Sequence, residues 1–388
     1  MMRRGVAFAA PVVALLGLAF SCPAQNAPGM RVVDLTAADG TALKATFFAA
    51  AKPGPGVIML HQCNRQRKVW DDLAASLSAS GINVLTLDFR GFGDSGGTPL
   101  DKLTPEKAGR DMADVWPGDV DLAVRYLESQ PGVNHDFIGA GGASCGVDQA
   151  VKLAARHAEV KSLVLLSEGT DREGREFLRK SPKLPLFMAA ADDDPDLGVV
   201  DIMQWLGDLS PDPANKLVHY TTGGHGVEMF AAHKELPGMI VDWFHATLKD
   251  PPSVPGTRAA GSMSAQSRFL ELLDRPDGFS KATAMYAEER RRDPKIVLFP
   301  EIVVNRLGYE HLLSGDNKGA IEIFKWNVTA YPLSPNAYDS LGDAYLADGQ
   351  RDLARENAKK TLELLATDTV DGQARRDGIK ANAESKLK

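Results

Sequence analysis

From residue 31 to about residue 249, short apolar runs that resemble strands alternate with segments that carry apolar residues at helical spacing. The expected strands are residues 32–36, 43–49, 56–60, 83–89, 137–140, 162–166, 184–191 and 216–220. The expected helices are residues 69–80, 120–129, 146–157, 197–209 and 239–248. Because strands that alternate with helices need crossover connections, the pattern predicts a mostly parallel, doubly wound α/β sheet covered on both faces.

The first two expected strands flank Asp39 and Gly40, a pair of residues typical of a hairpin turn. A hairpin joins antiparallel strands, whereas the later strands are joined by helices. The sheet is therefore expected to carry antiparallel strands at one edge.

The alternation ends at residues 250–265, which are rich in proline, glycine and serine and are expected to form an exposed linker. Residues 266–388 follow with a helical pattern. Two glycines and an alanine recur there after 34 positions, as Gly308 and Gly342, Gly315 and Gly349, and Ala320 and Ala354. Paired helices with this period are typical of a tetratricopeptide array, here over about residues 305–370. A generic helical bundle is the alternative for this all-α domain.

The N-terminus has the order of charge, apolar core and small residues that marks a secretory signal peptide, with cleavage expected after Ala24. The apolar run, residues 5–20, is shorter than the roughly 20 residues of a membrane-spanning helix. We therefore expect a periplasmic or secreted chain with no transmembrane segment after cleavage. The alternative is a lipoprotein with a lipid on Cys22.

Composition narrows the class of protein. A length of 388 residues predicts two domains, and 44% hydrophobic with 24% charged residues is typical of a globular protein with a sizeable core. The net charge of −7 argues against a nucleic-acid-binding protein, which normally presents a basic face.

The strongest chemical signal is Gly142-Ala143-Ser144-Cys145-Gly146, a G-x-S-x-G motif between an expected strand and an expected helix. In that context the motif forms a tight turn that presents a serine hydroxyl above the sheet edge. The flanking glycines are needed because side chains there would clash with the neighbouring strand or helix. Ser144 is the candidate nucleophile. Cys145 is the alternative, although its thiol is expected to point away from the substrate.

A serine hydroxyl needs a base to take its proton, and His225 lies in a glycine-rich loop after the last expected strand. A carboxylate should orient that histidine, and an acidic run follows the strand at residues 184–191. We assign Asp194 because it lies three residues after the strand and just before a proline; Asp193 is the alternative. The order Ser, Asp, His is the one associated with α/β hydrolases.

With these motifs, residues 31–249 resemble the α/β-hydrolase superfamily and are most similar to dienelactone-hydrolase-like esterases. Residues 61–64 stand where the family keeps its His-Gly oxyanion loop, and residues 88–95 match its D-x-R-G-x-G-x-S turn. Two departures are Gln62, where the family has glycine, and Ser144, where dienelactone hydrolases have cysteine.

The resemblance implies an oxyanion hole formed by the backbone N–H groups of Cys63 and Cys145. It also implies that His61 organises its loop and that Arg90 and Asp94 are structural. No cofactor and no metal are expected. The two cysteines should lie close together, either joined as a disulfide or as separate buried thiols.

Three functions follow from these residues. The first is an exported serine hydrolase of small carboxylic esters or lactones. The second is an amide or peptide hydrolase with the same triad, and the third is a binding protein whose helical repeats hold a protein or peptide partner. Only about 17 residues, 168–184, separate two strands where many relatives insert a lid, so an open site is expected.

Overall fold

The computed structural model describes residues 29–249, 263–275, 277–296 and 298–388. The expected signal peptide and nearly all of the expected linker lie outside these residues. No helix in the described part of the chain is long and apolar enough to cross a membrane.

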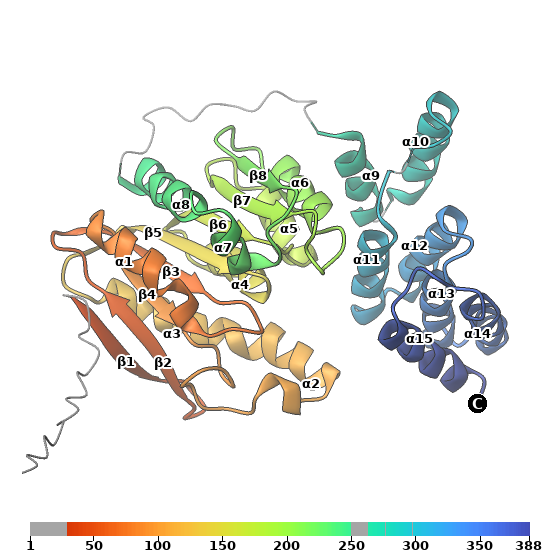
Figure 1. The fold of residues 1–388 in the computed structure, drawn as a ribbon, viewed down its shortest axis with the longest axis horizontal. Helices are drawn as coiled ribbons and strands as arrows, with labels where there is room; N and C mark the ends of the chain where they lie inside the picture. The colour runs from red at the N-terminus through yellow and green to blue at the C-terminus, as the bar shows by residue number, and fades with distance from the viewer. Residues whose placement is uncertain (1–28, 250–262, 276, 297) are drawn as a thin grey trace, which may run out of the picture.

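Eight strands form one sheet in the order β1-β2-β4-β3-β5-β6-β7-β8 (Figure 1). The strands are β1 Met30–Thr36, β2 Ala42–Phe48, β3 Gly54–Leu60, β4 Asn83–Leu87, β5 Val133–Ala143, β6 Val160–Leu166, β7 Leu186–Ala191 and β8 Lys216–Tyr220. β2 is antiparallel to both β1 and β4, and the other pairs are parallel. The predicted edge hairpin and mostly parallel sheet are confirmed, and together they make the α/β-hydrolase fold.

Helices cover both faces of the sheet, as predicted. The five expected helices are α1 Asp71–Ala79, α3 Trp116–Glu128, α4 Cys145–Arg156, α6 Val199–Leu209 and α8 Leu236–Phe244. α1 and α8 share one buried apolar cluster with the sheet, whereas α3, α4 and α6 share another on the opposite face. The layers therefore present the carboxyl ends of the parallel strands at one edge of the sheet.

Three helices were not predicted from the sequence: α2 Pro105–Arg110, α5 Arg172–Arg179 and α7 Met229–Ala232. α5 lies in the segment that was expected to be a plain connection. It is capped by Asp171, the residue before its first turn, whose side chain accepts a hydrogen bond from Gly174 N at 3.0 Å. The helix buries Arg175 and Leu178, so a charged residue forms part of its inward face.

The C-terminal region is entirely helical in the described residues. Its helices are α9 Ala265–Asp274, α10 Phe279–Arg292, α11 Glu301–Leu313, α12 Asn317–Ala330, α13 Pro335–Ala347, α14 Arg351–Leu365 and α15 Gln373–Lys386. α11 and α12 begin 34 residues before α13 and α14, respectively. Gly315 and Gly349 both have positive φ, 82° and 79°, at the turn inside each pair. The helix pairs thus repeat with the predicted period, while their identity as tetratricopeptide repeats stays a prediction.

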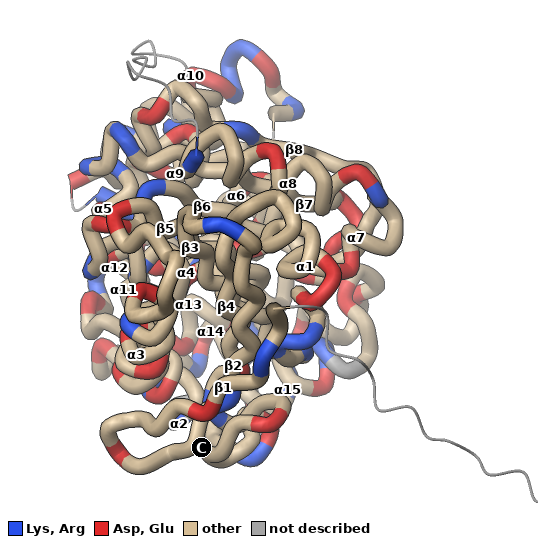
Figure 2. The backbone as a smooth tube through the Cα atoms, turned by 90° about the vertical axis from the view of Figure 1, so that its left-hand side faces the viewer, with Lys and Arg blue, Asp and Glu red and all other residues tan. Residues whose placement is uncertain are grey.

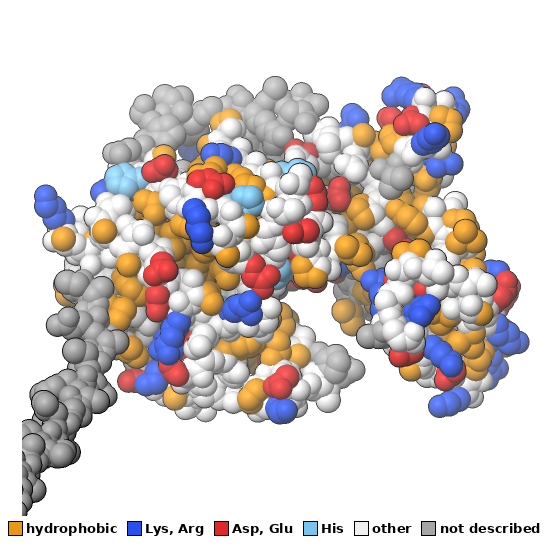
Figure 3. Space-filling view, viewed as in Figure 1, with side chains coloured by type: hydrophobic (Ala, Val, Ile, Leu, Met, Phe, Trp, Pro, Cys, Tyr) orange, Lys and Arg blue, Asp and Glu red, His pale blue; other side chains and the backbone are white. Residues whose placement is uncertain are grey.

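The helical region packs against the α/β domain, and the two meet along one side of the molecule (Figures 1 and 3). Arg175 of α5 is buried in this contact. Its guanidinium donates to Asp274 Oδ1 at 2.7 Å and to Glu310 Oε2 at 2.6 Å, and it lies 4.9 Å from the ring centroid of Trp205. One arginine of the α/β domain is therefore held by carboxylates from both α9 and α11.

Charged residues of both signs are interspersed along the chain in the view of Figure 2, in keeping with the small net charge. That view shows no large basic face.

Candidate active site

Ser144 occupies the turn between the end of β5 and the start of α4. Its backbone has φ 50° and ψ −127°, a conformation that non-glycine residues rarely adopt. Its N–H donates to Leu166 O on the neighbouring strand at 2.9 Å, which fixes the turn against the sheet. Strained backbone of this kind persists where the surrounding structure enforces it, and it points to a functional role for the side chain.

The motif needs glycine at positions 142 and 146, because neighbouring backbone atoms leave no room for a side chain. A Cβ on Gly142 would overlap Gly146 O, and a Cβ on Gly146 would overlap Leu60 O at the end of β3. The turn therefore closes against its own helix on one side and against β3 on the other. This is the clash that the sequence motif predicts.

His225 and Asp194 lie together at the same edge of the sheet. His225 Nδ1 is 2.9 Å from both carboxylate oxygens of Asp194, and both side chains are buried. Asp193 has a different partner, because its Oδ1 accepts a hydrogen bond from Gly224 N at 2.9 Å. Of the two acidic residues left open by the sequence, Asp194 is the one that contacts the histidine.

The charges around His225 favour its protonated form. Burial of the ring opposes that form, but the hydrogen bond to Asp194 and its negative charge outweigh burial and raise the pKa of His225 above 6.5. Asp196, whose Oδ2 is 3.6 Å from Nδ1, acts in the same direction. The imidazole of His225 is thus a stronger base than a free histidine side chain.

The histidine loop, residues 223–226, lies against the serine turn. A Cβ on Gly226 would come within 3.3 Å of Ala143 Cβ, so the residues next to His225 and Ser144 are in contact distance of each other. Within the described residues, no hydrogen bond joins Ser144 Oγ to His225. Such bonds are often long in proteins without substrate and shorten in the complex.

The oxyanion loop, residues 61–64, is organised by His61. This side chain is fully buried; its Nε2 accepts from Phe89 N at 3.1 Å, and its Nδ1 lies 2.8 Å from Gln62 O. Burial lowers the pKa of His61, which keeps the ring neutral. The hydrogen bonds of His61 are thus with the backbone of its own loop and of the loop after β4, and its ring packs against Phe89 and Phe92.

Gln62 has a role that the sequence did not reveal. Its Oε1 accepts a hydrogen bond from Val227 N at 2.9 Å, and its Nε2 donates to Asn64 Oδ1 at 2.8 Å. The side chain is fully buried, and it lies so close to Gly226 that a Cβ on that glycine would overlap Gln62 Oε1. The residue that departs from the family pattern therefore connects the oxyanion loop to the histidine loop.

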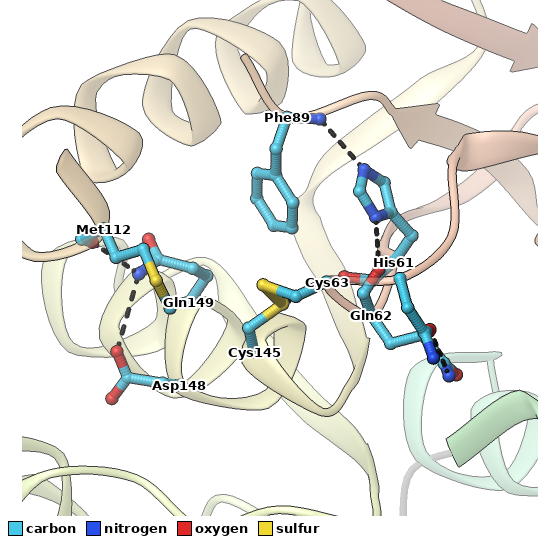
Figure 4. The surroundings of a disulfide bond; sticks show 9 residues. His61, Gln62, Cys63, Phe89, Met112, Cys145, Asp148 and Gln149 are labelled. Atoms are coloured by element: carbon cyan, nitrogen blue, oxygen red, sulfur yellow. Dashed lines mark hydrogen bonds between the residues drawn. A yellow bond between two sulfur atoms is a disulfide. The ribbon is translucent and has the colours of Figure 1, made fainter. Parts of the chain in front are cut away.

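Cys63 and Cys145 form a disulfide with a Cα–Cα distance of 5.9 Å. Figure 4 shows the bond between the oxyanion loop and the start of α4. Of the two arrangements that the sequence left open, the structure has the bonded one. Cys145 has no free thiol while this disulfide is formed, so it is not available as the alternative nucleophile.

The disulfide also holds two backbone donors near each other. In the part of the chain that the structure describes, neither Cys63 N nor Cys145 N donates to a protein acceptor. Cys145 is the first residue of α4, so the positive end of the helix dipole adds to its N–H. A developing oxyanion is the kind of group that such paired donors stabilise.

A cavity of about 270 Å³ adjoins Ser144 and Cys145. Its remaining lining comes from the loop after β6, from α4, α5, α6 and α11, and from Met112; it includes Asp148, Glu168, Gly169, Thr170, Asp171, Arg175, Ile202, Trp205, Leu206, Val303, Arg306, Leu307 and Glu310. A helix from the C-terminal region thus forms one wall of the cavity, which the short segment between β6 and β7 did not predict.

Arg90 and Asp94 are held in ion pairs away from the serine. Arg90 donates to both oxygens of Asp119 at 2.6 and 2.7 Å and to Asp39 at 2.7 Å. Asp94 accepts from Arg67 Nη2 at 2.9 Å. These contacts fix the turn after β4.

Two sets of side chains among the described residues bring possible metal ligands within 4.8 Å of one another. One is Glu128, His157 and Glu159; the other is Asp194, Asp196 and His225. In the second set the Asp194 oxygens already contact His225 Nδ1, so hydrogen bonding accounts for their proximity.

No family model matches the sequence. A thiohydrolase of Aspergillus aculeatus is 27% identical over 225 residues, which cover 55% of this chain and 63% of the relative. A polyketide transferase of a Penicillium species is 27% identical over 157 residues, which cover 40% of this chain and 50% of the relative. The match thus spans less than two thirds of the length of these relatives.

Solved structures of α/β hydrolases are similar at low identity. An α/β hydrolase of a Penicillium species has a TM-score of 0.46 and 16% identity, covering 57% of this chain and 99% of that one. An esterase of Pyrococcus furiosus has a TM-score of 0.44 and 19% identity, covering 56% of this chain and 91% of that one.

Proposed function

We propose that this protein is a serine hydrolase that cleaves small carboxylic esters or lactones through an acyl-enzyme on Ser144. The observation that carries the proposal is the strained Ser144 turn beside the buried His225–Asp194 pair. A nucleophile, a base and an orienting carboxylate in this arrangement are the three parts that acyl transfer requires.

Each residue has one role in the proposed reaction. His225 takes the proton of Ser144 as the hydroxyl attacks the carbonyl carbon, and it later gives that proton to the leaving alcohol. Asp194 keeps Nδ1 protonated, so that Nε2 is the basic nitrogen. The N–H groups of Cys63 and Cys145 stabilise the oxyanion. Water then attacks the acyl-enzyme, with His225 again as the base.

Thioesters are a second candidate substrate class, favoured by the similarity to the Aspergillus thiohydrolase. The same triad attacks a thioester carbonyl, and a thiolate is an easier leaving group than an alkoxide. A direct comparison of an ester and a thioester with the same acyl group distinguishes the two classes.

We further propose that the helical region is a tetratricopeptide array and that the chain is exported. The first rests on the 34-residue offset between the helix pairs. The second rests on the N-terminal order of arginines, apolar run and small residues.

The test is a panel of p-nitrophenyl esters, small lactones and one acyl thioester, with a fluorophosphonate probe in parallel. We expect hydrolysis by the wild type and covalent labelling of Ser144, both lost in Ser144→Ala. A wild type that is neither active nor labelled would contradict the proposed function and favour the binding-protein hypothesis.

A further inference from the structure

The cavity beside Ser144 is built by two regions that are far apart in the sequence. One apolar wall is α6, with Ile202, Trp205 and Leu206, and the facing wall is α11, with Val303 and Leu307. Val303 and Leu307 are each 2% exposed. The walls therefore bring apolar side chains of the C-terminal region to the candidate nucleophile.

The charged groups that line the cavity are all held in ion pairs, including Asp171, whose carboxylate lies 2.7 Å from Lys152 Nζ just outside the lining. Arg306 is ion-paired with Glu168, and Glu310 is bound by the buried Arg175. The carboxylate of Asp148 lies 2.9 Å from Lys152 Nζ. Because these charges are neutralised locally, the apolar walls are the surface left to contact a substrate, and an uncharged hydrocarbon chain fits them.

α11 is held firmly in this position. Arg175 joins it to the α/β domain through Glu310, and the same arginine binds Asp274 of α9. At the other end of the contact, a Cβ on Gly198 would lie 2.5 Å from Val303 Cγ2, so the loop before α6 and α11 approach closely. A wall fixed at two points can discriminate between substrates by size.

Two hollows flank the disulfide, and they differ in size. The cavity at Ser144 and Cys145 has about 270 Å³, whereas the hollow at Cys63 has about 910 Å³ and is lined by residues 63–66, 68–69, 91–93 and 99–101. Of the two, only the smaller cavity is lined by Ser144, so it is the one within reach of an acyl group on the serine.

We propose that α11 of the helical region sets the length of the acyl chain, with Leu307 as the specificity-determining residue and Val303 as its neighbour in the wall. This inference rests on the proposed ester hydrolysis. Acyl chains that reach α11 gain contacts until they meet Leu307, and longer chains are rejected by its side chain. The C-terminal region thus selects the acyl chain of the substrate, whether or not it also binds a partner.

The experiment measures kcat/KM for p-nitrophenyl butyrate, hexanoate, octanoate and decanoate with full-length Leu307→Ala, Leu307→Trp and wild type. The control is Leu313→Ala, which lies on the same helix but is 87% exposed and outside the cavity. The readout is the ratio of decanoate to butyrate within one preparation, because that ratio is independent of the fraction of active protein.

We expect Leu307→Ala to raise this ratio roughly 10-fold or more, since a few methylene groups in an apolar pocket have effects of that size. Leu307→Trp should lower it, and Leu313→Ala should leave it unchanged. If Leu307→Trp does not fold, Val303→Ala provides a second enlargement of the wall, with a rise expected.

An unchanged ratio in the Leu307 and Val303 variants of an active enzyme overturns this inference alone. The inference is equally overturned if the variants change the preference among acetate esters of different alcohols instead, because the cavity then holds the leaving group. A wild type with no activity and no Ser144 labelling overturns the proposed function, and the inference with it.

Discussion

Gln62 Oε1 accepts a hydrogen bond from Val227 N at 2.9 Å, and this bond joins the oxyanion loop to the loop that carries His225. One side chain thereby positions both the Cys63 donor, its neighbour in sequence, and the proposed base. One loop follows β3 in the middle of the sheet, and the other follows β8 at its edge. Their spacing decides whether base and oxyanion donors face the same carbonyl group.

We expect Gln62→Ala to lower kcat for a small ester about 5-fold while KM changes little, because a lost hydrogen bond costs about 1 kcal/mol. Steady-state kinetics on p-nitrophenyl butyrate measure both constants. Asn64→Ala is the matched control: it removes the partner of Gln62 Nε2 and leaves the bond to Val227 N in place. Equal losses in the two variants would argue against a positioning role.

The rate should depend on pH through His225. Only the neutral imidazole accepts the proton of Ser144, so kcat/KM should fall as the pH drops below the pKa of His225. Asp194 raises that pKa, so the acid limb should lie above pH 6.5. Asp194→Asn should move the limb to lower pH and reduce kcat by about 10⁴-fold, as in other triads. Asp193→Asn, which removes the neighbouring charge and keeps an oxygen acceptor for Gly224 N, should leave the limb in place.

Reduction of the disulfide should slow catalysis. The bond holds two oxyanion donors in place, and losing one well-placed donor can cost about 10²-fold in kcat. We expect dithiothreitol to lower kcat at least several-fold in the wild type and to have no effect on Cys63→Ala. Alkylation of the denatured, unreduced protein followed by mass analysis counts free thiols. Adducts on both Cys63 and Cys145 would show that the bond does not form.

Arg175 should be important for stability as well as for the position of α11. Its removal leaves two carboxylates, Asp274 and Glu310, without their shared partner in a buried contact. Breaking a buried pair in this way costs about 3–5 kcal/mol. We expect Arg175→Ala to lower the free energy of unfolding in urea by that amount. The control Lys360→Ala, which breaks an exposed pair with Glu363, should leave it nearly unchanged, because water screens such a pair.

A chain that ends near residue 250 should lose much of its activity. A linker separates the two predicted domains along the sequence, but Arg175 and the apolar face of α6 would be exposed without α9 and α11. Activity assays and urea unfolding of this truncation test the point. Full activity on all acyl lengths would mean that the α/β domain is complete by itself.

Local patterns predicted much of this structure. β8 occupies residues 216–220 as expected, because its apolar run is bounded by clear turn signals. β5 begins four residues earlier than expected. Residues 134–136 are polar and exposed and so did not look like a strand, but Val133 and Asn134 pair with Gly54 and Pro55 of β3. α5 was missed because six of its eight residues are charged or glycine, which leaves little apolar periodicity.

The site could be predicted only in part. The residues of the serine turn, the acidic run and the histidine loop each follow a strand end, so their convergence at one edge follows from the parallel sheet. The α11 wall could not be predicted, because it depends on long-range ion pairs such as Arg175 with Asp274, 99 residues apart. Gln62 was also missed, since its partner Val227 N is a backbone group 165 residues away.

The disulfide between Cys63 and Cys145 also restricts the unfolded chain. It closes a segment of 82 residues that contains β4, α3 and β5, from the middle of the sheet. In the chain-entropy account, a loop of this length lowers the entropy of the unfolded ensemble by an amount equivalent to about 4.5 kcal/mol at 25 °C. The centre of the sheet therefore resists thermal unfolding for the same covalent reason that its catalytic edge keeps its geometry.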